Sequence, residues 1–199
     1  MRDFFLNDDY QVLCDRDGEL RIYHDFFDKD FFKVLHESLK WQQDQITLYG
    51  KTHNVPRLQS FYGDEGISYS YSGIRLKANP WTSELEAIKS KIEEKTTYFF
   101  NACLCNLYRH GADYAAWHSD DEPELGRNPV IASASFGEQR KFVLKHKFDK
   151  GVEPIEINIP DRSLILMLGP LQHNWKHQLN KTAKKVDPRI NLTFRKIIL

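Results

Sequence analysis

The sequence has few cysteines. Cys14, Cys103 and Cys105 make an odd count, and the last two lie too close together in an expected strand to pair easily. This does not indicate the disulfide framework of a small secreted protein. We therefore expect a reducing compartment, which is the cytoplasm, or the nucleus if the organism is a eukaryote.

Long hydrophobic runs are also missing. The segment MRDFFLNDDY has no apolar signal core, and no stretch approaches the roughly 20 apolar residues that span a bilayer. We expect no membrane partner. The sequence also lacks an internal repeat, a low-complexity tract and a linker, so its 199 residues are expected to form a single domain.

No excess of one charge is present, because 28 Lys and Arg residues balance 28 Asp and Glu residues. A neutral total neither supports nor excludes nucleic-acid binding, which depends on a local basic face. Basic residues do gather at positions 140–150 and 181–196. A charge run is usually only a solvated face, so this is a weak indication.

Two segments carry helical patterns. The first runs from about 31 to 41, with Asp30 placed to cap it and apolar residues every four positions. The second runs from 83 to about 96, where Ser83 and Glu86 form a capping box. Both helices precede most of the strand-like segments.

Short runs rich in β-branched and aromatic residues follow the second helix, separated by turn signals. They cover 102–108, 130–136, 141–146, 155–159, 163–168 and 190–198. Two further strand-like segments, 45–51 and 68–76, lie between the helices. Strands at this spacing favour an antiparallel sandwich or barrel, jelly rolls included, and with the two helices they indicate the α+β class.

The most informative stretch is NLYRHGADYAAWHSDDE at 106–122. His118 and Asp120 would point to one side of an extended segment, where both could bind one metal ion. His-x-Asp alone occurs often by chance. His173 or His177 could add the third ligand of the facial triad that non-haem iron oxygenases use, although the same ligand types also suit zinc.

The C-terminal strand RINLTFR alternates strictly between polar and apolar residues. Its polar face carries Arg189, Asn191, Thr193 and Arg195. Two arginines that face into a barrel would be costly unless each met an anion, and guanidinium groups bind carboxylates bidentately. The strand therefore suits a dicarboxylate co-substrate; the alternative is a surface strand with an ordinary polar outer face.

The blocks CNLYRHG, WHSDDEPELGR, IASASFG, NWKH and PRINLTFRKI together resemble the AlkB family of oxidative dealkylases, particularly its DNA-repair homologues. The resemblance covers at least 55–197 in consistent order. It implies a double-stranded β-helix (jelly-roll) core over about 98–199. Supporting helices and a nucleotide-recognition hairpin region would occupy about 25–97. It also implies Fe(II), 2-oxoglutarate and O₂ as cofactor and co-substrates.

Site residues follow from the resemblance position by position. The metal ligands would be His118, Asp120 and His177, since Trp175-Lys176-His177 fits the family pattern better than His173. The residues that would hold 2-oxoglutarate are Asn106, Tyr108, Arg189, Asn191, Thr193 and Arg195.

The resemblance also implies a substrate pocket. Tyr69 and Tyr71 would line it, although both could equally be core residues, and Asp121 and Glu122 would read the exocyclic amino group of the base. The hairpin residues Tyr49, Gly50 and Lys51 would wedge between base pairs, and Arg57 would lie near the nucleic-acid backbone.

The implied function is oxidative demethylation of alkylated bases such as N1-methyladenine and N3-methylcytosine in DNA, by a monomer. The basic segments 140–147 and 181–185 would contact phosphates. An oxygenase that acts on RNA or on a protein side chain remains an alternative. A jelly-roll protein that binds metal without turnover is a second alternative, but it would leave Arg189 and Arg195 without a purpose.

Overall fold

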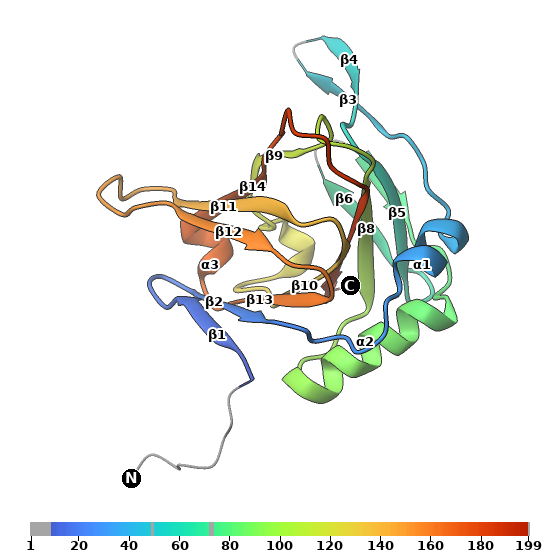
Figure 1. The fold of residues 1–199 in the computed structure, drawn as a ribbon, viewed down its shortest axis with the longest axis horizontal. Helices are drawn as coiled ribbons and strands as arrows, with labels where there is room; N and C mark the ends of the chain where they lie inside the picture. The colour runs from blue at the N-terminus through green and yellow to red at the C-terminus, as the bar shows by residue number, and fades with distance from the viewer. Residues whose placement is uncertain (1–8, 49, 72–73, 199) are drawn as a thin grey trace.

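The computed structural model describes residues 9–48, 50–71 and 74–198. Two antiparallel sheets form its core (Figure 1). The larger has the order β1 (Gln11–Cys14), β2 (Glu19–Tyr23), β13 (Ser163–Leu168), β10 (Ile131–Gly137), β15 (Arg189–Arg195), β8 (Ala102–Tyr108) and β5 (Leu58–Gly63). The smaller has the order β12 (Ile155–Ile159), β11 (Arg140–His146), β14 (Trp175–Leu179) and β9 (Ala115–His118). This arrangement is a jelly roll.

Apolar side chains from both sheets pack between them. Ile131 and Met167 of the larger sheet join Leu144 and Ile157 of the smaller sheet in one buried cluster. The opposite face of the larger sheet is covered by α1 (Phe32–Ser38) and α2 (Ser83–Thr96), as Figure 1 shows. The larger sheet is therefore buried on both faces, and every residue of β15 is buried.

Burial on both faces decides how the alternation of β15 is used. Its apolar residues Ile190, Leu192 and Phe194 pack in the cluster that includes helix α2. Its polar residues must then point between the two sheets, because neighbouring residues of a strand face opposite ways. The alternative of a surface strand is wrong, since the two arginines of the strand are only 3% and 2% exposed.

Two hairpins fill the region between the helices. The segments expected as single strands at 45–51 and 68–76 are each a pair: β3 (Gln45–Leu48) with β4 (Lys51–Asn54), and β6 (Ser68–Tyr71) with β7 (Ile74–Lys77). The first pair turns at Gly50, whose positive φ of 75° suits glycine. Figure 1 shows this hairpin projecting from the body of the molecule.

The helix ends differ from the prediction by small amounts. Asp30 does accept a hydrogen bond from the Phe32 N–H at 2.8 Å, but α1 ends at Ser38 rather than near 41. The N-cap of α2 is Thr82, whose Oγ1 accepts the Leu85 N–H at 3.3 Å, so the expected capping box of Ser83 and Glu86 is wrong: the cap lies one residue earlier, and Leu85 cannot return the second bond.

Several strands have no clear sequence signal. β1 and β2 lie in the N-terminal part of the chain, where the sequence patterns predict no element, and β2 pairs with β13 along five residues. β5 pairs with β8, so the larger sheet draws on residues well before 98. The patterns do not predict β9 or β14 either, and a short α3 (Leu171–Asn174) and a 3₁₀ turn (Pro123–Leu125) complete the fold. Among the described residues, no helix has the length and apolarity that crossing a membrane requires.

Candidate metal and co-substrate site

Three potential metal ligands converge where β9 and β14 pair. His118 ends β9 directly opposite His177 on β14, and their ring centroids are 4.3 Å apart. Asp120 follows β9, and its Oδ2 lies 3.9 Å from His177 Nε2. One ligand atom from each residue lies within 4.8 Å of the others. His173 lies elsewhere, exposed on α3, where its Nε2 accepts a backbone N–H.

The protonation of these side chains suits a cation. Burial lowers the pKa of His177 to about 3, so its imidazole is neutral. Burial raises the pKa of Asp120, but the positive charge around it, chiefly that of the Arg195 guanidinium, outweighs burial and holds that pKa below its usual range. His118 Nδ1 lies 2.7 Å from the Ala116 carbonyl oxygen, which can only accept, so Nδ1 donates and Nε2 is the ring nitrogen left for a metal ion. The donor set is two imidazoles and a carboxylate, which are the ligand types of the Fe(II) facial triad.

A buried glutamine holds the loop that carries Asp120. Gln172 on α3 is 1% exposed, and its Oε1 accepts the Asp120 N–H at 2.9 Å. The preceding residue, Ser119, donates its hydroxyl to the Trp175 carbonyl at 2.9 Å. Lys147 Nζ donates two hydrogen bonds, one to the Gln172 backbone carbonyl at 2.8 Å and one to Asp121 Oδ2 at 3.0 Å. These bonds fix the carboxylate ligand relative to β14, and sequence patterns indicate none of them.

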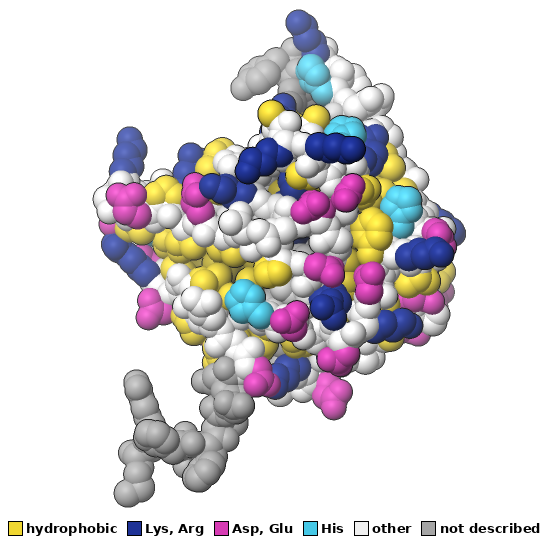
Figure 2. Space-filling model, viewed as in Figure 1, with side chains coloured by type: hydrophobic (Ala, Val, Ile, Leu, Met, Phe, Trp, Pro, Cys, Tyr) yellow, Lys and Arg dark blue, Asp and Glu magenta, His cyan; other side chains and the backbone are white. Residues whose placement is uncertain are grey.

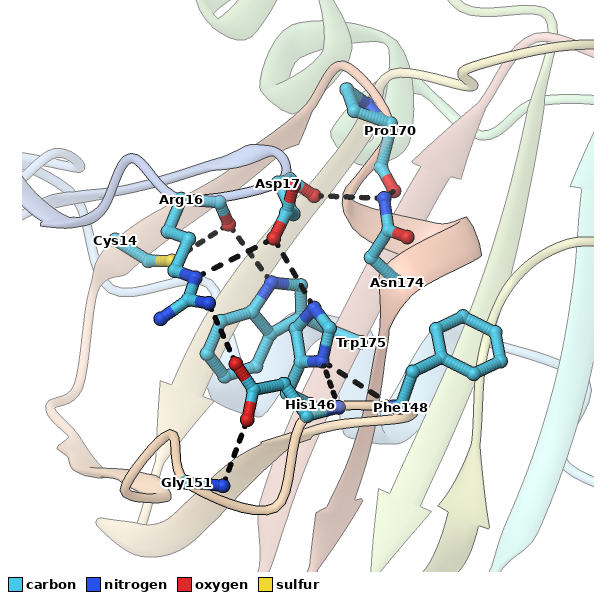
Figure 3. Close-up of polar contacts among 10 residues, drawn as sticks. Cys14, Arg16, Asp17, His146, Phe148, Gly151, Pro170, Asn174 and Trp175 are labelled. Atoms are coloured by element: carbon cyan, nitrogen blue, oxygen red, sulfur yellow. Dashed lines mark hydrogen bonds and ion pairs between the residues drawn. The ribbon is translucent and has the colours of Figure 1, made fainter.

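The start of β14 is braced from behind, as Figure 3 shows. The Trp175 indole donates to the Arg16 carbonyl at 3.0 Å and packs edge-on against His146 at 5.1 Å. His146 Nδ1 accepts the Asp149 N–H at 2.8 Å, and its Nε2 lies 3.4 Å from Asp17 Oδ2. The turn between β1 and β2 is thereby tied to the strand that carries His177.

Two buried arginines lie on the cavity side of β15. Arg195 lies 3.6 Å from Asp120, and Arg189 donates to Ser135 Oγ at 2.8 Å. Burial lowers the pKa of Arg189 to about 10, and no carboxylate of the described residues offsets that cost. Arg189 Nε and Arg195 Nε and Nη1 are buried and have no hydrogen-bond partner within the described part of the chain. Unused guanidinium donors at two depths fit the two carboxylates of 2-oxoglutarate.

The other residues expected to hold 2-oxoglutarate lie on the same surface. Asn191 Nδ2 donates to Ser133 Oγ at 2.7 Å, and Thr193 donates to Asn191 Oδ1 at 3.2 Å. The Tyr108 ring lies 5.5 Å from the Arg189 guanidinium carbon. These contacts orient the polar face of β15 toward one cavity.

Asn106 has a different set of contacts. Its Oδ1 accepts Arg57 Nε at 2.7 Å and Gln59 Nε2 at 3.0 Å, so its amide N–H₂ group is the part left to face the cavity. Arg57 also donates to the Tyr114 carbonyl at 3.3 Å. These contacts hold Arg57 in the cavity wall, and its place near a nucleic-acid backbone stays a prediction.

One cavity of about 540 Å³ joins these groups. The triad, both arginines, Asn106, Tyr108, Asn191 and Thr193 all line it. Asp121 and Glu122 also lie on its wall, but Asp121 is exposed and engaged by Lys147. Glu122 is partly buried and shares a hydrogen bond with Tyr69, while its Oε2 has no partner among the described residues; burial together with Asp120 raises its pKa. A ligand with a positive charge or an N–H group would complement Glu122.

The predicted substrate residues of the tyrosine pair and of the 49–51 hairpin lie in different places relative to the cavity. Tyr69 lines the cavity but is 1% exposed, stacked on Phe61 at 5.8 Å and 4.7 Å from the Arg195 guanidinium carbon, so it forms a fixed wall. Tyr49 and the side chain of Tyr71 fall outside the described residues. Gly50 and Lys51 are exposed on the hairpin and are not among the described cavity-lining residues, whereas Ile46 of the same hairpin is.

The basic segment 140–147 is mostly not available to phosphate. Arg140 is 3% exposed and donates to the carbonyls of His110, Asp113 and Asn180, so its expected phosphate contact is wrong. Lys141 pairs with Glu156 at 2.6 Å. The charge pattern alone could not show that these cations are already neutralised or bonded.

Comparison with known proteins agrees with this geometry. The sequence profile of the 2OG-Fe(II) oxygenase superfamily matches residues 20–195. DNA oxidative demethylase ALKBH2 of Mus musculus is 39% identical over 160 residues, which cover 77% of this chain and 67% of that protein. Alpha-ketoglutarate-dependent dioxygenase alkB homolog 3 is 41% identical in Bos taurus, over 83% of this chain and 60% of the relative. In Mus musculus it is 38% identical, over 94% and 70%.

A solved structure shows the same fold. The structure of OsALKBH1 superposes with a TM-score of 0.63 at 14% sequence identity, covering 94% of this chain and 100% of that one. The chain spans about 60 to 70% of the length of the curated relatives named above. The superfamily match and these identities, with the His-Asp-His cluster above two buried arginines, identify an Fe(II)- and 2-oxoglutarate-dependent dioxygenase: the chain belongs to the AlkB family of the 2OG-Fe(II) oxygenase superfamily.

Proposed function

We propose that this dioxygenase demethylates alkylated nucleic-acid bases of the N1-methyladenine and N3-methylcytosine type. The observation that carries the proposal is that one cavity is lined by both the half-buried Glu122 carboxyl and the His118–Asp120–His177 cluster. Both lesions are cationic bases with an exocyclic amino group, which a carboxylate complements in charge and in hydrogen bonding. The curated relatives named DNA oxidative demethylase support the same substrate class.

Each group of residues has a separate part in this reaction. His118, Asp120 and His177 would hold Fe(II), and Arg189 and Arg195 would hold the two ends of 2-oxoglutarate. With both bound, the site supplies an O₂-dependent oxidation that hydroxylates the N-methyl carbon while 2-oxoglutarate becomes succinate and CO₂. The hydroxymethyl group then leaves as formaldehyde and restores the base.

The chain's own residues orient the reactants. Tyr69, fixed by its contacts with Phe61 and Arg195, forms a rigid wall for a base that has been extruded into the cavity. Glu122 lies two residues from the metal ligand Asp120, so a base bonded to it would present its methyl group near the triad.

We further propose that the loop 181–185 contacts phosphates, since Lys181, Lys184 and Lys185 are exposed. Replacing Lys184 and Lys185 by Glu should weaken DNA binding and flatten its salt dependence. Uncoupled 2-oxoglutarate turnover should not change, because neither residue lies in the cavity wall. Unchanged DNA affinity would remove this loop from the footprint.

The decisive experiment loads the protein anaerobically with Fe(II) and 2-oxoglutarate. Air and an oligonucleotide with N1-methyladenine or N3-methylcytosine follow, single-stranded or duplex, DNA or RNA. Mass spectrometry should show loss of one methyl group with matching succinate. His118→Ala and Asp120→Ala should abolish both products, whereas His173→Ala, a nearby histidine outside the triad, should retain them.

The other outcomes are informative. Succinate without any change in the oligonucleotides would keep the oxygenase and reject the nucleic-acid substrate. Demethylation of RNA alone would move the substrate from DNA to RNA. No succinate from the wild-type protein under any condition would refute turnover and favour a non-catalytic metal-binding protein.

A further inference from the structure

Two aromatic side chains at the rim of the cavity each lie against a lysine. Lys145 Nζ is 4.2 Å from the centroid of the Trp117 ring, and Lys181 Nζ is 4.2 Å from that of Tyr114. Both aromatic residues are half-buried and line the cavity, so their rings are partly open to solvent. We call these four residues and Lys176 the β9 rim.

A bulge in β9 explains the position of Trp117. Between the pairs His118–His177 and Ala115–Leu179, β9 has two residues where β14 has one. An extra residue breaks the alternation of a strand and re-aims the side chains next to it. Ala115 and His118, three positions apart, can therefore both pair with buried residues of β14, while Trp117 faces the other way, against Lys145 of β11. Because Trp117 also lines the cavity, it lies where the outer surface of the smaller sheet meets the cavity.

The lysines of the β9 rim lack the neutralisation found elsewhere on the small sheet. Lys145 and Lys176 lie directly opposite each other on β11 and β14, and like charges in that position destabilise a sheet. Within the described residues, neither of them nor Lys181 forms an ion pair, whereas Lys141 on β11 is paired with Glu156. Figure 2 shows Lys and Arg side chains gathered over the end of the molecule where Figure 1 labels β9, β14 and β11. An anionic ligand would relieve this repulsion.

We propose that the β9 rim binds the unpaired nucleotides of a single-stranded substrate beside the extruded base, with Trp117 and Tyr114 stacking on bases and the three lysines on phosphates. This inference rests on the proposed function and adds the strand form of the substrate. Aromatic residues interleaved with cations are the usual surface for single strands. A duplex keeps its base faces stacked, so only a single strand can use the two rings.

The first test replaces the Trp117 ring. Fluorescence anisotropy measures the affinity of Trp117→Ala for a single-stranded oligonucleotide with N3-methylcytosine and for the matching duplex. We expect the affinity for the single strand to fall about tenfold, which is typical when one ring that stacks on a base is removed. The affinity for the duplex should fall less than about twofold. Trp117→Phe should restore most of the affinity, because it keeps a stacking ring.

Two controls separate stacking from damage to the site. Co(II) binding by Trp117→Ala should stay at the wild-type value, which shows that the adjacent His118 is in place. Phe99→Ala removes an aromatic ring that is 72% exposed but is not among the cavity-lining residues, and it should not change either affinity.

The second test concerns the lysines. For single strands, the slope of log affinity against log salt concentration should become shallower by about 0.7 for each phosphate that Lys145→Ala or Lys176→Ala no longer neutralises. Lys89→Ala is the matched control. Lys89 belongs to helix α2, away from the β9 rim, and like Lys145 it lies over an aromatic ring, with its Nζ 4.6 Å from the centroid of Trp81. Its slope should equal that of the wild type.

The outcomes distinguish the β9 rim from the proposed function. If the wild type demethylates the oligonucleotide and Trp117→Ala binds the single strand as tightly as the wild type, the rim proposal is overturned and the function stands. Equal weakening for single strand and duplex overturns the selectivity for single strands. If the wild type neither binds nor demethylates any oligonucleotide, the proposed function falls and the rim proposal falls with it.

Discussion

Gln172→Met tests whether the residues behind the triad control its geometry. Gln172 is buried, and its Oε1 accepts the N–H of the buried Asp120 at 2.9 Å, while its Nε2 lies 3.2 Å from Met167 Sδ. Methionine has a similar length and suits an apolar neighbour, but its thioether is at best a weak acceptor. The substitution leaves the Asp120 N–H without its partner and otherwise preserves packing.

The size of the effect follows from that one hydrogen bond. An unsatisfied buried N–H costs about 1–3 kcal/mol. The loop can avoid this cost if it moves the Asp120 carboxylate out of the triad. Metal binding must then restore the original loop position, so the whole cost appears as lost affinity for the metal. That range corresponds to an increase of about 5- to 150-fold in the dissociation constant of the metal. It overlaps the roughly 10- to 100-fold loss of metal affinity that is usual when a residue hydrogen-bonded to a metal ligand is replaced.

Anaerobic titration with Co(II), followed by its visible absorption, measures the dissociation constant directly. Gln172→Glu keeps an acceptor in the same place and should bind Co(II) at least as well as the wild type. Gln178→Met, on the outward side of β14 next to His177, is the matched control and should change nothing. Wild-type Co(II) affinity in Gln172→Met, with only a lower Tm, would refute the reasoning and leave Gln172 as a packing residue.

Three other variants test the charged groups. Arg189→Met should not lower the Tm of the apoprotein, since it removes a buried cation that has no carboxylate partner among the described residues. The rise in Tm that 2-oxoglutarate causes in the wild type should disappear in this variant, and a retained rise would contradict the role of Arg189. Arg140→Ala should lower the Tm by removing hydrogen bonds to three carbonyls, yet leave the salt dependence of DNA binding unchanged. Burial raises the pKa of Asp113, but the Arg109 guanidinium outweighs burial and holds that pKa below its usual range. The unfolded chain thus takes up a proton near pH 4 before the native state does, so this stability is present above that pH and is lost below it. In Asp113→Asn, urea unfolding should show a lower free energy of unfolding at about pH 7 and a flatter fall between about pH 5 and pH 2.

The strands that sequence predicted best are those whose local pattern matches their final surroundings. β8, β12 and β13 have the predicted bounds, because turn residues flank short runs of apolar and β-branched side chains. β9 and β14 gave no such signal. They are short, and their inward positions carry His118 and His177 in place of apolar residues, so function removed the pattern that would reveal them.

The site shows the same division. The alternation of β15 was enough by itself to place four polar residues on one face, since the period of a strand is fixed by backbone geometry. The partners of Arg57 and Arg140 could not be read in this way. Their donors meet carbonyl or amide oxygens that are as far as 57 positions away in the sequence, and only the folded topology brings these groups together.

The two arginines of β15 differ in how their charge is balanced, and the difference bears on the order in which the site is filled. Arg195 lies 3.6 Å from Asp120, so part of its charge is offset within the protein and part of the Asp120 charge is shared. Arg189 has a hydroxyl and an aromatic ring as neighbours, and burial lowers its pKa to about 10. A dicarboxylate therefore gains most at Arg189, where it supplies the missing anion. At Arg195 it must compete with a metal ligand. A metal ion that binds Asp120 weakens this competition, because it draws the carboxylate charge away from Arg195 and frees that guanidinium for the co-substrate. Metal and co-substrate should accordingly bind with positive coupling, and the coupling should pass through Arg195 and not through Arg189.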